Sequence, residues 1–307
     1  DFTVRVIDNA SSDDVVHFLK ERYPQVTVIR NARNLGFAPA QNQGIKYAID
    51  KWEGEDLSQK FILVTNPDII FHPNFLNNLM AEVEEHPKVG SFGGKLLRAF
   101  GENLTDEVLK KTVCSDLIDS TGLRANRACW FYERGAGEMD AGQFDDQKEV
   151  FGISGALVLY RASALNTVRQ IDEFFDNDFF AYKEDIDLAW RLQGAGWNAR
   201  YVPKAIAHHY RGMYGPEKTT WIERLKNRKK KSQTNSHYST RNHWCLLMKN
   251  LSFWHGVVRL PWLVPAELGR FVYVCLFEPK NISSATEAVG LFPRMMKKRH
   301  SIFRQRN

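Results

Sequence analysis

The chain alternates short apolar runs with longer segments in which apolar residues recur every three or four positions. Short runs of this kind are typical of buried strands, and the longer period is typical of helices that bury one face. The pattern predicts strands at residues 3–7, 26–29, 61–65, 89–97, 151–160 and 199–202. It predicts helices at residues 15–23, 38–52, 75–85 and 238–251, and one that follows the acids at 184–187. This alternation indicates an α/β protein with a mostly parallel sheet flanked by helices.

Three acidic residues, Glu184, Asp185 and Asp187, stand at the start of one predicted helix. A helix N-terminus favours negative charge, so capping explains an isolated pair of acids. Here the acids follow apolar surface, which can tune a carboxylate as a base. The aromatic residues that form this surface are Phe174, Phe175, Phe179, Phe180 and Tyr182. The segment is therefore a candidate catalytic site.

Polar residues with ligand chemistry end several predicted strands, where open α/β sheets bind their ligands. Asp8 could accept a hydrogen bond from a nucleobase, and Asp68 could bind a divalent cation that bridges a diphosphate. His208 and His209 end a further strand, and neutral imidazole suits Mn²⁺-like ions. Each of these residues alone is explained by a cap, a turn or a structural histidine. Together they predict a nucleotide and metal site beside a catalytic carboxylate.

Between residues 99 and 147 the periodic pattern weakens, and glycine and charged residues become frequent. Long segments without regular structure inside a compact domain are usually functional or disordered. We expect this segment to be an excursion over the active-site face.

Charge is distributed unevenly along the 307 residues. From residue 203 onward there are 20 Lys and Arg, 5 Glu and no Asp, whereas the remainder has 22 basic and 31 acidic residues. Such asymmetry indicates an acidic catalytic body, residues 1–215, and a basic appendage, residues 216–307, that meets an anionic partner. Membrane lipid, nucleic acid and a phosphorylated substrate all fit that description.

The composition of the appendage favours a membrane surface. Residues 251–277 are apolar and rich in Trp, but Pro261, Pro265 and several charged residues interrupt them, so we expect an interfacial segment rather than a spanning helix. The four cysteines are scattered, which is typical of a reduced cytosolic compartment. We therefore predict a cytoplasmic protein that lies peripherally on the inner face of the cell membrane and binds no nucleic acid.

The ordered series of motifs resembles a family 2 inverting glycosyltransferase of the Rossmann-like GT-A fold, and within it the rhamnosyltransferase-like branch. The stretches that carry the resemblance are VIDNASSDD at 6–14, NLGFAPAQNQGI at 34–45, NPDI at 66–69, SGALVLYRASAL at 154–165, FFAYKEDIDLAWRLQGAGW at 179–197, HHYRG at 208–212 and HYSTRNHWCLLMKN at 237–250.

The resemblance implies roles for individual residues. Asp185 would be the catalytic base, and Glu184 beside it would bind or orient the acceptor. Asp8 would contact the nucleobase, while Asn34 and Gly36 shape the nucleotide pocket. The residues implied to line the sugar pocket are Ser154, Gly155, Ala156 and Asp187.

The resemblance also implies Mg²⁺ or Mn²⁺ as a cofactor. Asp68 stands at the place of the family's Asp-x-Asp metal carboxylate, but Asn66 replaces the first acid of that motif. A later metal ligand would be His208 or His209. The family begins with a strand and a helix ahead of the strand at residues 3–7, so this first strand is missing here and we expect a gap or an exposed edge beside residues 3–7.

The implied reaction transfers a sugar, with rhamnose as the hypothesis, from a dTDP- or UDP-type donor to a hydroxyl of a glycan or polyprenyl-linked acceptor. A catalytically inactive nucleotide-binding scaffold of the same fold is the alternative. A nucleic-acid-binding protein is disfavoured by the Trp-, Leu- and Pro-rich segment, and a Rossmann dehydrogenase by the absence of Gly-x-Gly-x-x-Gly after the first strand.

Overall fold

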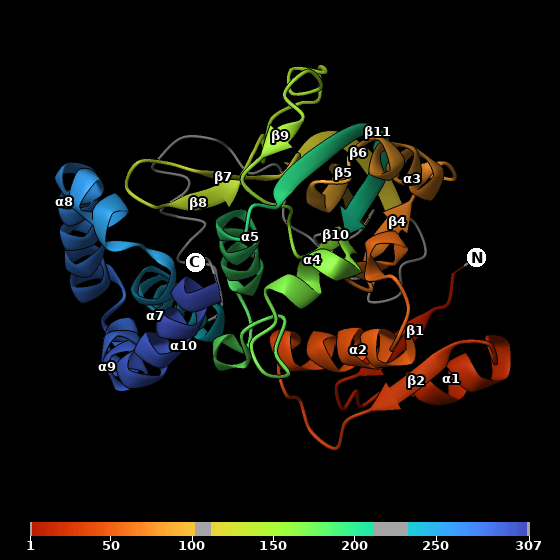
Figure 1. The fold of residues 1–307 in the computed structure, drawn as a ribbon, viewed down its shortest axis with the longest axis horizontal. Helices are drawn as coiled ribbons and strands as arrows, with labels where there is room; N and C mark the ends of the chain where they lie inside the picture. The colour runs from red at the N-terminus through yellow and green to blue at the C-terminus, as the bar shows by residue number, and fades with distance from the viewer. Residues whose placement is uncertain (1, 102–111, 211–232, 306–307) are drawn as a thin grey trace.

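The computed structural model describes residues 2–101, 112–210 and 233–305 of the chain (Figure 1). A central sheet has helices on both faces, a small two-stranded unit lies on the N-terminal side, and a helical layer follows at the C-terminal side. The expected α/β architecture with a C-terminal helical extension is therefore confirmed. The basic run at residues 224–231 lies outside the described residues.

The N-terminal unit is a parallel pair of strands, β1 (Arg5–Asp8) and β2 (Thr27–Arg30), joined by α1 (Val15–Arg22). α2 (Phe37–Lys51) packs across β1, where Gly44 lies against the Ile7 side chain. Among the described residues β2 is the one strand that pairs with β1, so the other edge of β1 has no strand neighbour. This arrangement agrees with the expected unpaired edge.

Seven strands form the central sheet. Along its main path the order is β3, β10, β5, β11 and β4, while β6 pairs with β5 and β9 pairs with β11. The strands are β3 (Phe61–Thr65), β4 (Ile69–Phe71), β5 (Val89–Gly101), β6 (Thr112–Ser120), β9 (Glu149–Val150), β10 (Leu157–Arg161) and β11 (Asn198–Tyr210).

The sheet is mixed, so the prediction of mostly parallel strands is wrong. β5 and β11 run parallel, whereas the other described pairs of this sheet are antiparallel. A strand buried on both faces has the same apolar run in either direction, so the pattern that located β10 could not orient it. β10 also enters the sheet after the excursion at residues 99–147 instead of a short helical crossover, which leaves its direction free.

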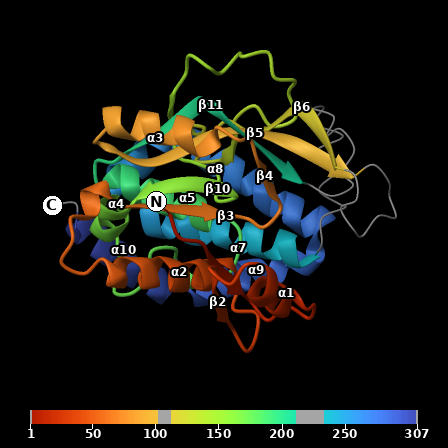
Figure 2. The same ribbon diagram turned by 90° about the vertical axis from the view of Figure 1, so that its right-hand side faces the viewer.

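Every residue of β10 is buried. The strand lies between α3 on one side of the sheet and α2 on the other (Figure 2). Leu157 and Leu159 face the cluster formed with α3 (Phe75–Glu85). Val158 and Tyr160 face the cluster that contains residues of α2, α4 (Ala162–Thr167) and α5 (Glu184–Gly194). Because successive side chains of a strand point to opposite faces, one strand serves both cores.

Residues 112–150 partly extend the sheet and partly cover its end. β6 pairs with the C-terminal part of β5, on the edge where β10 pairs with Ser91 and Phe92. β7 (Leu123–Ala125) pairs with β8 (Phe131–Glu133) in a separate hairpin. The strand expected at residues 151–160 begins at Leu157, because residues 154–156 form a turn instead.

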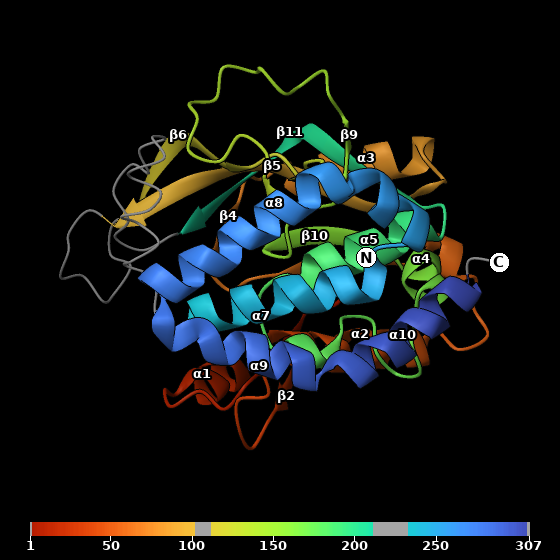
Figure 3. The same ribbon diagram turned by 90° about the vertical axis from the view of Figure 1, so that its left-hand side faces the viewer.

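The C-terminal helices form a layer against α5 (Figure 3). They are α7 (Gln233–Asn250), α8 (Phe253–Phe277), the short η3 (Pro279–Asn281), α9 (Ile282–Gly290) and α10 (Phe292–Gln305). Ile186 of α5, Leu246 of α7 and Met295 of α10 belong to one buried cluster. α7 therefore shares a core with the helix that carries the acids.

α8 is a continuous helix of 25 residues, and Pro261 and Pro265 do not end it. Pro261 and Pro265 lie four residues apart inside it, and the fixed φ of proline is compatible with a helix even though each loses one hydrogen bond. Within the described part of the chain, α8 is the one helix whose length and composition would allow it to cross a membrane. Only 6% of its most apolar stretch of 18 residues is buried.

Candidate active site

Glu184 and Asp185 form the first turn of α5, as the sequence predicts. The residues that lead into this turn have unusual backbone geometry: φ is 59° at Phe180, 70° at Tyr182 and 68° at Lys183. Residues other than glycine rarely adopt a positive φ. Such backbone geometry persists only where the surrounding structure imposes it. The acids thus follow a segment that other elements must hold.

Asn242 on α7 holds that segment. Its Nδ2 donates to the backbone oxygens of Phe179, Ala181 and Tyr182 at 2.8, 2.9 and 2.7 Å, and the side chain is fully buried. Arg241 donates to the backbone oxygen of Asp178 at 2.6 Å. The C-terminal helix layer therefore supports the backbone immediately before the acids.

Asp185 is held by backbone amides. Its Oδ2 accepts from the Gly155 amide at 3.0 Å, and its Oδ1 accepts from the Ile186 amide at 2.8 Å. Burial raises the pKa of Asp185 above its usual value, although these two amide hydrogen bonds act in the opposite direction. A partly exposed carboxylate with a raised pKa is suited to accept a proton.

Glu184 lies beside Asp185 and is 7% exposed. Burial, followed by the charge of Asp185, raises the pKa of Glu184 to about 8. Two adjacent carboxyl groups in a poorly solvated site do not both ionise easily. At neutral pH we assign the proton to Glu184, which leaves Asp185 as the ionised member.

Glu133 is a third acid of this site, and the sequence interpretation missed it. It ends β8, and its carboxylate accepts from the Ser154 hydroxyl at 2.8 Å. Burial and the charge of Asp185 raise its pKa to about 7. No local signal could have identified it, because its partners come from β6 and from the turn before β10.

Asp187 does not face an open pocket, which corrects its expected place in the sugar pocket. Its side chain is completely buried, and its oxygens contact Lys249 at 2.8 Å, Arg191 at 2.9 Å and Asn250 at 2.8 Å. These contacts satisfy the carboxylate inside the protein. Asp187 joins α5 to α7 and has no surface on which to bind a sugar.

The turn at residues 154–156 lies between the acids and the strand-end loop that contains Asp68. The Ser154 hydroxyl contacts Glu133, the Gly155 amide contacts Asp185, and the Ala156 oxygen accepts from the Asn66 amide at 2.8 Å. The three expected pocket residues therefore connect two groups of predicted functional residues.

The residues expected to contact the nucleotide gather at the carboxyl end of β1. The Asp8 carboxylate is buried; it accepts from the Ser11 amide at 2.8 Å and pairs with Arg30 at 3.2 Å. The hydrogen bonds with Ser11 lower the pKa of Asp8. In this structure Asp8 orders the loop that follows β1, and a nucleobase contact stays a prediction.

Asn9, which the sequence interpretation did not select, ties the loop at Asn34 and Gly36 to β1. Its Nδ2 donates to Asn34 Oδ1 at 2.9 Å and to the Gly36 oxygen at 3.1 Å. Gly36 has φ +92°, and a Cβ there would lie 2.5 Å from the Phe180 ring. The expected nucleotide loop thus touches the strained segment before the acids.

Of the two candidate histidines, His209 faces Asp68. The His209 Nε2 atom lies 3.3 Å from Asp68 Oδ1, whereas His208 stacks on His72 with ring centroids 5.3 Å apart. The two histidines point to opposite faces because they are consecutive residues of β11. Burial lowers the pKa of His208. His209 is therefore the candidate ligand.

Asp68 and His209 supply two atoms of the kind that bind divalent cations. The His209 Nδ1 atom contacts a buried Asp119 oxygen at 2.8 Å, and Asp119 also pairs with Arg98 at 3.3 Å. A carboxylate on one ring nitrogen is the usual support of a metal-binding histidine. The other ring nitrogen, Nε2, faces Asp68 Oδ1, a buried oxygen for which the described part of the chain provides no hydrogen-bond donor. Within the described residues no third His, Cys, Asp or Glu joins them.

The fold is similar to that of a solved α/β protein. A crystal structure of GalNAc-T7 with UDP, GalNAc and Mn²⁺ superimposes with a TM-score of 0.52 at 11% identity and covers 80% of this chain and 41% of that chain. This likeness confirms the expected GT-A fold. The family model "Glycosyltransferase like family 2" matches residues 1–234. The chain belongs to this family.

Two curated relatives are rhamnosyltransferases. The chain is 28% identical over 213 residues to N-acetylglucosaminyl-diphospho-decaprenol L-rhamnosyltransferase of Mycobacterium tuberculosis, a match that covers 67% of this chain and 66% of the relative. It is 31% identical over 177 residues to rhamnosyltransferase WbbL of Escherichia coli, which covers 57% of this chain and 61% of the relative. The chain thus spans less than two thirds of the length of each relative.

Proposed function

We propose that the protein is an inverting glycosyltransferase in which Asp185 is the general base. The observation that carries the proposal is the pair of acids at the start of α5, where Asp185 is partly exposed and is held by the Gly155 amide. Glu184 holds the proton at neutral pH because burial raises its pKa to about 8. Asp185 is then free to accept a proton from the acceptor.

The chemistry requires one base. Asp185 removes the proton from an acceptor hydroxyl while the hydroxyl oxygen attacks the anomeric carbon of the donor. The bond from that carbon to the nucleoside diphosphate breaks, and the diphosphate leaves with the electron pair. Attack from the side opposite the leaving group inverts the anomeric configuration. Because no covalent enzyme intermediate forms, no second nucleophile is needed.

Asp68 and His209 would hold Mg²⁺ or Mn²⁺ on the donor side of this site. When bound, such an ion offsets the negative charge of the diphosphate. Asp119 would keep the imidazole of His209 oriented toward the ion. Asn34, Gly36 and Asp8 belong to the neighbouring loops at the end of β1, where the nucleoside would lie.

The relatives guide the choice of substrates. One is named for L-rhamnose transfer to N-acetylglucosaminyl-diphospho-decaprenol, and the other is named as a rhamnosyltransferase. We propose a rhamnose donor of the dTDP or UDP type and a glycan on a polyprenyl diphosphate as the acceptor. An acceptor of that kind would be presented at a membrane surface.

α8 supports a membrane-bound position. Its charged residues turn toward the protein: Arg259 donates to the Asn126 oxygen at 3.1 Å, and Glu267 contacts His243 at 2.8 Å and Trp244 at 2.9 Å. Its large apolar residues face outward, including Trp254, Val258, Leu268 and Phe271. Charged contacts that fix one side of α8 to the protein favour a helix that lies on the bilayer over one that crosses it.

The basic residues of α10 contribute less to the surface than the sequence indicates. Lys298 pairs with Asp176 and Asp178, and Arg299 donates to the backbone oxygens of Met248 and Leu251. Both cations are thus paired with groups of the protein, although their side chains are partly exposed. We therefore propose that the apolar side of α8 makes the principal contact with the inner face of the cell membrane.

The base is tested by Asp185→Asn, with dTDP-L-rhamnose and an N-acetylglucosaminyl-diphospho-polyprenol as probes. We expect the rate of transfer to fall by about 100-fold or more, while Asp50→Asn, an exposed acid on α2, keeps the wild-type rate. Equal rates in Asp185→Asn and wild type would reject Asp185 as the base. A folded wild type that binds dTDP or UDP but transfers nothing with any probe would favour the inactive scaffold.

Vesicle flotation tests the membrane contact. We expect the full chain to float with phosphatidylglycerol vesicles and the triple variant Trp254→Glu, Val258→Glu, Leu268→Glu to stay in the soluble fraction. Phe18→Glu, which changes an exposed apolar residue of α1, is the matched control. Flotation of the triple variant to the wild-type extent would show that α8 is not the contact.

A further inference from the structure

Glu133 lies outside every motif that the sequence interpretation selected, yet its carboxylate belongs to the active site. Oε1 accepts from the Ser154 hydroxyl at 2.8 Å, and Oε2 accepts from the Ser120 hydroxyl at 2.5 Å. Both oxygens are therefore engaged by hydroxyl groups of the protein. This arrangement favours a role that acts through the protein over a direct contact with substrate.

Glu133 and Asp185 are connected through the backbone turn at Ser154 and Gly155. Ser154, which Glu133 contacts, directly precedes Gly155, whose amide donates to Asp185 Oδ2 at 3.0 Å. A Cβ at Gly155 would lie 3.0 Å from the Asp185 Cβ, so the turn and the acid are in close contact. A displacement of Ser154 would move the donor that holds the base.

Neighbouring residues fix the position of Glu133. Arg134 is buried and donates to the Thr121 hydroxyl at 3.0 Å, to the Thr121 oxygen at 2.7 Å and to the Gln147 oxygen at 2.7 Å. The Ser120 hydroxyl accepts from the Gly122 amide at 3.0 Å, which orients its hydrogen toward Glu133. The hairpin therefore presents the carboxylate in one defined place.

Within the described residues, no cationic side chain contacts the Glu133 carboxylate. Burial and the charge of Asp185 raise the pKa of Glu133 to about 7, and the two serine hydroxyls oppose that rise only in part. Interaction between two charges is reciprocal, so an ionised Glu133 also makes the Asp185 carboxylate more basic. If the role were limited to accepting the hydrogen bond from Ser154, the oxygen of a neutral amide would serve equally well.

We propose that Glu133 is a positioning residue of the transfer reaction: it fixes the Ser154–Gly155 turn that holds Asp185, and its charge strengthens Asp185 as a base. The inference rests on the function proposed above and deepens it. Glu133 belongs to the β7–β8 hairpin, and through the Ser154–Gly155 turn it links this hairpin to the base.

The pH dependence of turnover tests the charge. As pH rises through about 7, Glu133 loses its proton, and wild-type kcat should gain a further step on top of the rise caused by ionisation of Asp185. Glu133→Gln keeps an acceptor for Ser154 but cannot ionise, so it should match the wild type near pH 6 and fall below it by roughly threefold near pH 8. Glu138→Gln, an exposed acid of the same excursion, should keep the wild-type profile.

Glu133→Ala tests the positioning part. It removes both hydroxyl contacts, and we expect a loss of kcat of about tenfold or more at every pH, which Glu133→Gln should largely restore near pH 6. A wild-type pH profile in Glu133→Gln, or full activity in Glu133→Ala, would overturn the inference while leaving Asp185→Asn as the separate test of the base.

A measurement without substrate completes the test. In full-length protein labelled with [5-¹³C]glutamate, the carboxyl resonance that Glu133→Gln removes should titrate near pH 7. Its midpoint should move to lower pH in Asp185→Asn, because the neighbouring charge is gone. A midpoint that Asp185→Asn leaves unchanged would show that the two carboxyl groups are not coupled and would reject the proposal. This outcome does not depend on the identity of the sugar donor.

Discussion

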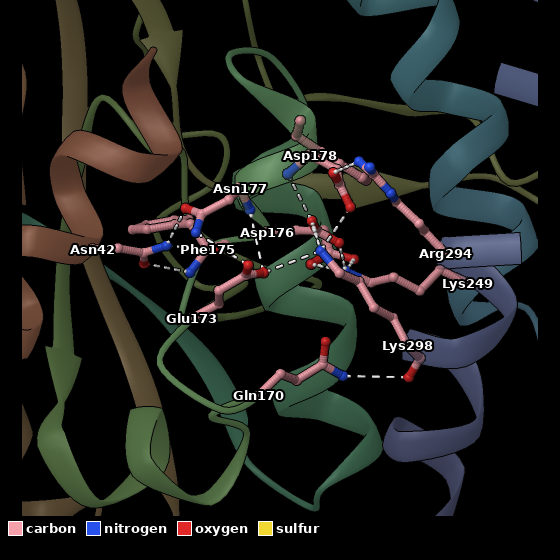
Figure 4. A network of polar contacts seen from close by, with 12 residues as sticks. Asn42, Gln170, Glu173, Phe175, Asp176, Asn177, Asp178, Lys249, Arg294 and Lys298 are labelled. Atoms are coloured by element: carbon pink, nitrogen blue, oxygen red, sulfur yellow. Dashed lines mark hydrogen bonds and ion pairs between the residues drawn. The ribbon is translucent and has the colours of Figure 1, made fainter. Parts of the chain in front are cut away.

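Replacing Lys249 with methionine should loosen the joint between α7 and the helix that carries the acids. Lys249 is completely buried. Its ammonium group contacts Asp176 in the loop before α5 (Figure 4) and Asp187 on α5. Lys298 of α10 also contacts Asp176, and Arg191 contacts Asp187. Methionine preserves most of the volume of the side chain but removes the shared cation.

The expected loss follows from these contacts. Removing one partner of a buried ion pair destabilises a protein by about 3–5 kcal/mol because the other charge is left without compensation. Here each aspartate keeps one cation, so we expect the lower end, about 3 kcal/mol. With an unfolding entropy of about 2.1 cal/mol/K per residue, a chain of this length should lose about 5 °C in Tm.

The loss should depend on pH in a defined direction. The charge of Lys249 contributes to holding the pKa of both Asp176 and Asp187 below the ordinary value of 3.8. A carboxyl group with a lowered pKa stabilises the folded state above its ordinary pKa, and this contribution is lost as pH falls through the folded value. The difference in Tm between wild type and Lys249→Met should therefore be full above about pH 5 and shrink below pH 3.8.

Thermal unfolding followed by circular dichroism between pH 3 and pH 8 measures this effect. Lys297→Met, which changes an exposed lysine of α10, should stay within about 0.5 kcal/mol of the wild type. Lys298→Met should have an intermediate effect, because its side chain is partly exposed. The reasoning is refuted if Lys249→Met unfolds at the wild-type temperature at pH 7, or if its deficit is the same at pH 3 and pH 7.

Three further changes test other parts of the site. Gly36→Ala would place a Cβ 2.5 Å from the Phe180 ring and should lower both Tm and kcat/KM, whereas Gly54→Ala, at φ +81° in open space, should lower Tm slightly and leave kcat/KM unchanged. Asn242→Ala should destabilise the protein by about 2–3 kcal/mol in urea unfolding, since three backbone oxygens lose their donor; Asn78→Ala, which removes one exposed contact, should be nearly neutral. His209→Ala should weaken Mn²⁺ binding in calorimetry at least tenfold, and His208→Ala should not; the opposite ranking would transfer the ligand role to His208.

Some of the site was predictable because its signals are local. Glu184 and Asp185 precede an amphipathic run and follow aromatic residues, and this order alone indicates the start of a helix. Asp68 and the two histidines follow apolar runs, which indicates strand ends. The local sequence held no signal that distinguishes His208 from His209 as the candidate ligand. The choice depended on which face of β11 turns toward Asp68, and pairing with β4 decides that face.

Other features depended on partners far away in the chain. Asp187 has the same local signal as Asp185, but Lys249 lies 62 residues later and neutralises it inside the protein. Glu133 stands in a segment without periodicity, and its partner Ser154 follows 21 residues later. Strand direction was misjudged for a related reason, since a strand buried on both faces has no directional pattern. The residue types were enough to locate the acids in the sequence. Only the tertiary contacts show how the surroundings of these acids differ.

The C-terminal helices connect two of these roles. α7 contacts α5 through Lys249 and Asn250, supports the residues before the acids through Asn242, and contacts α8 through His243 and Trp244. Consecutive residues of one helix thus fix both the acids and the helix whose apolar side faces outward. If α8 lies on a bilayer, α7 sets a constant distance between that surface and Asp185. A polyprenyl-linked acceptor needs this geometry, because its lipid stays in the membrane while its sugar hydroxyl must reach the base. For that reason a variant that uncouples α7 from α8, such as Glu267→Ala, should lower transfer to a polyprenyl-linked acceptor more than transfer to the same acceptor with a short, water-soluble chain.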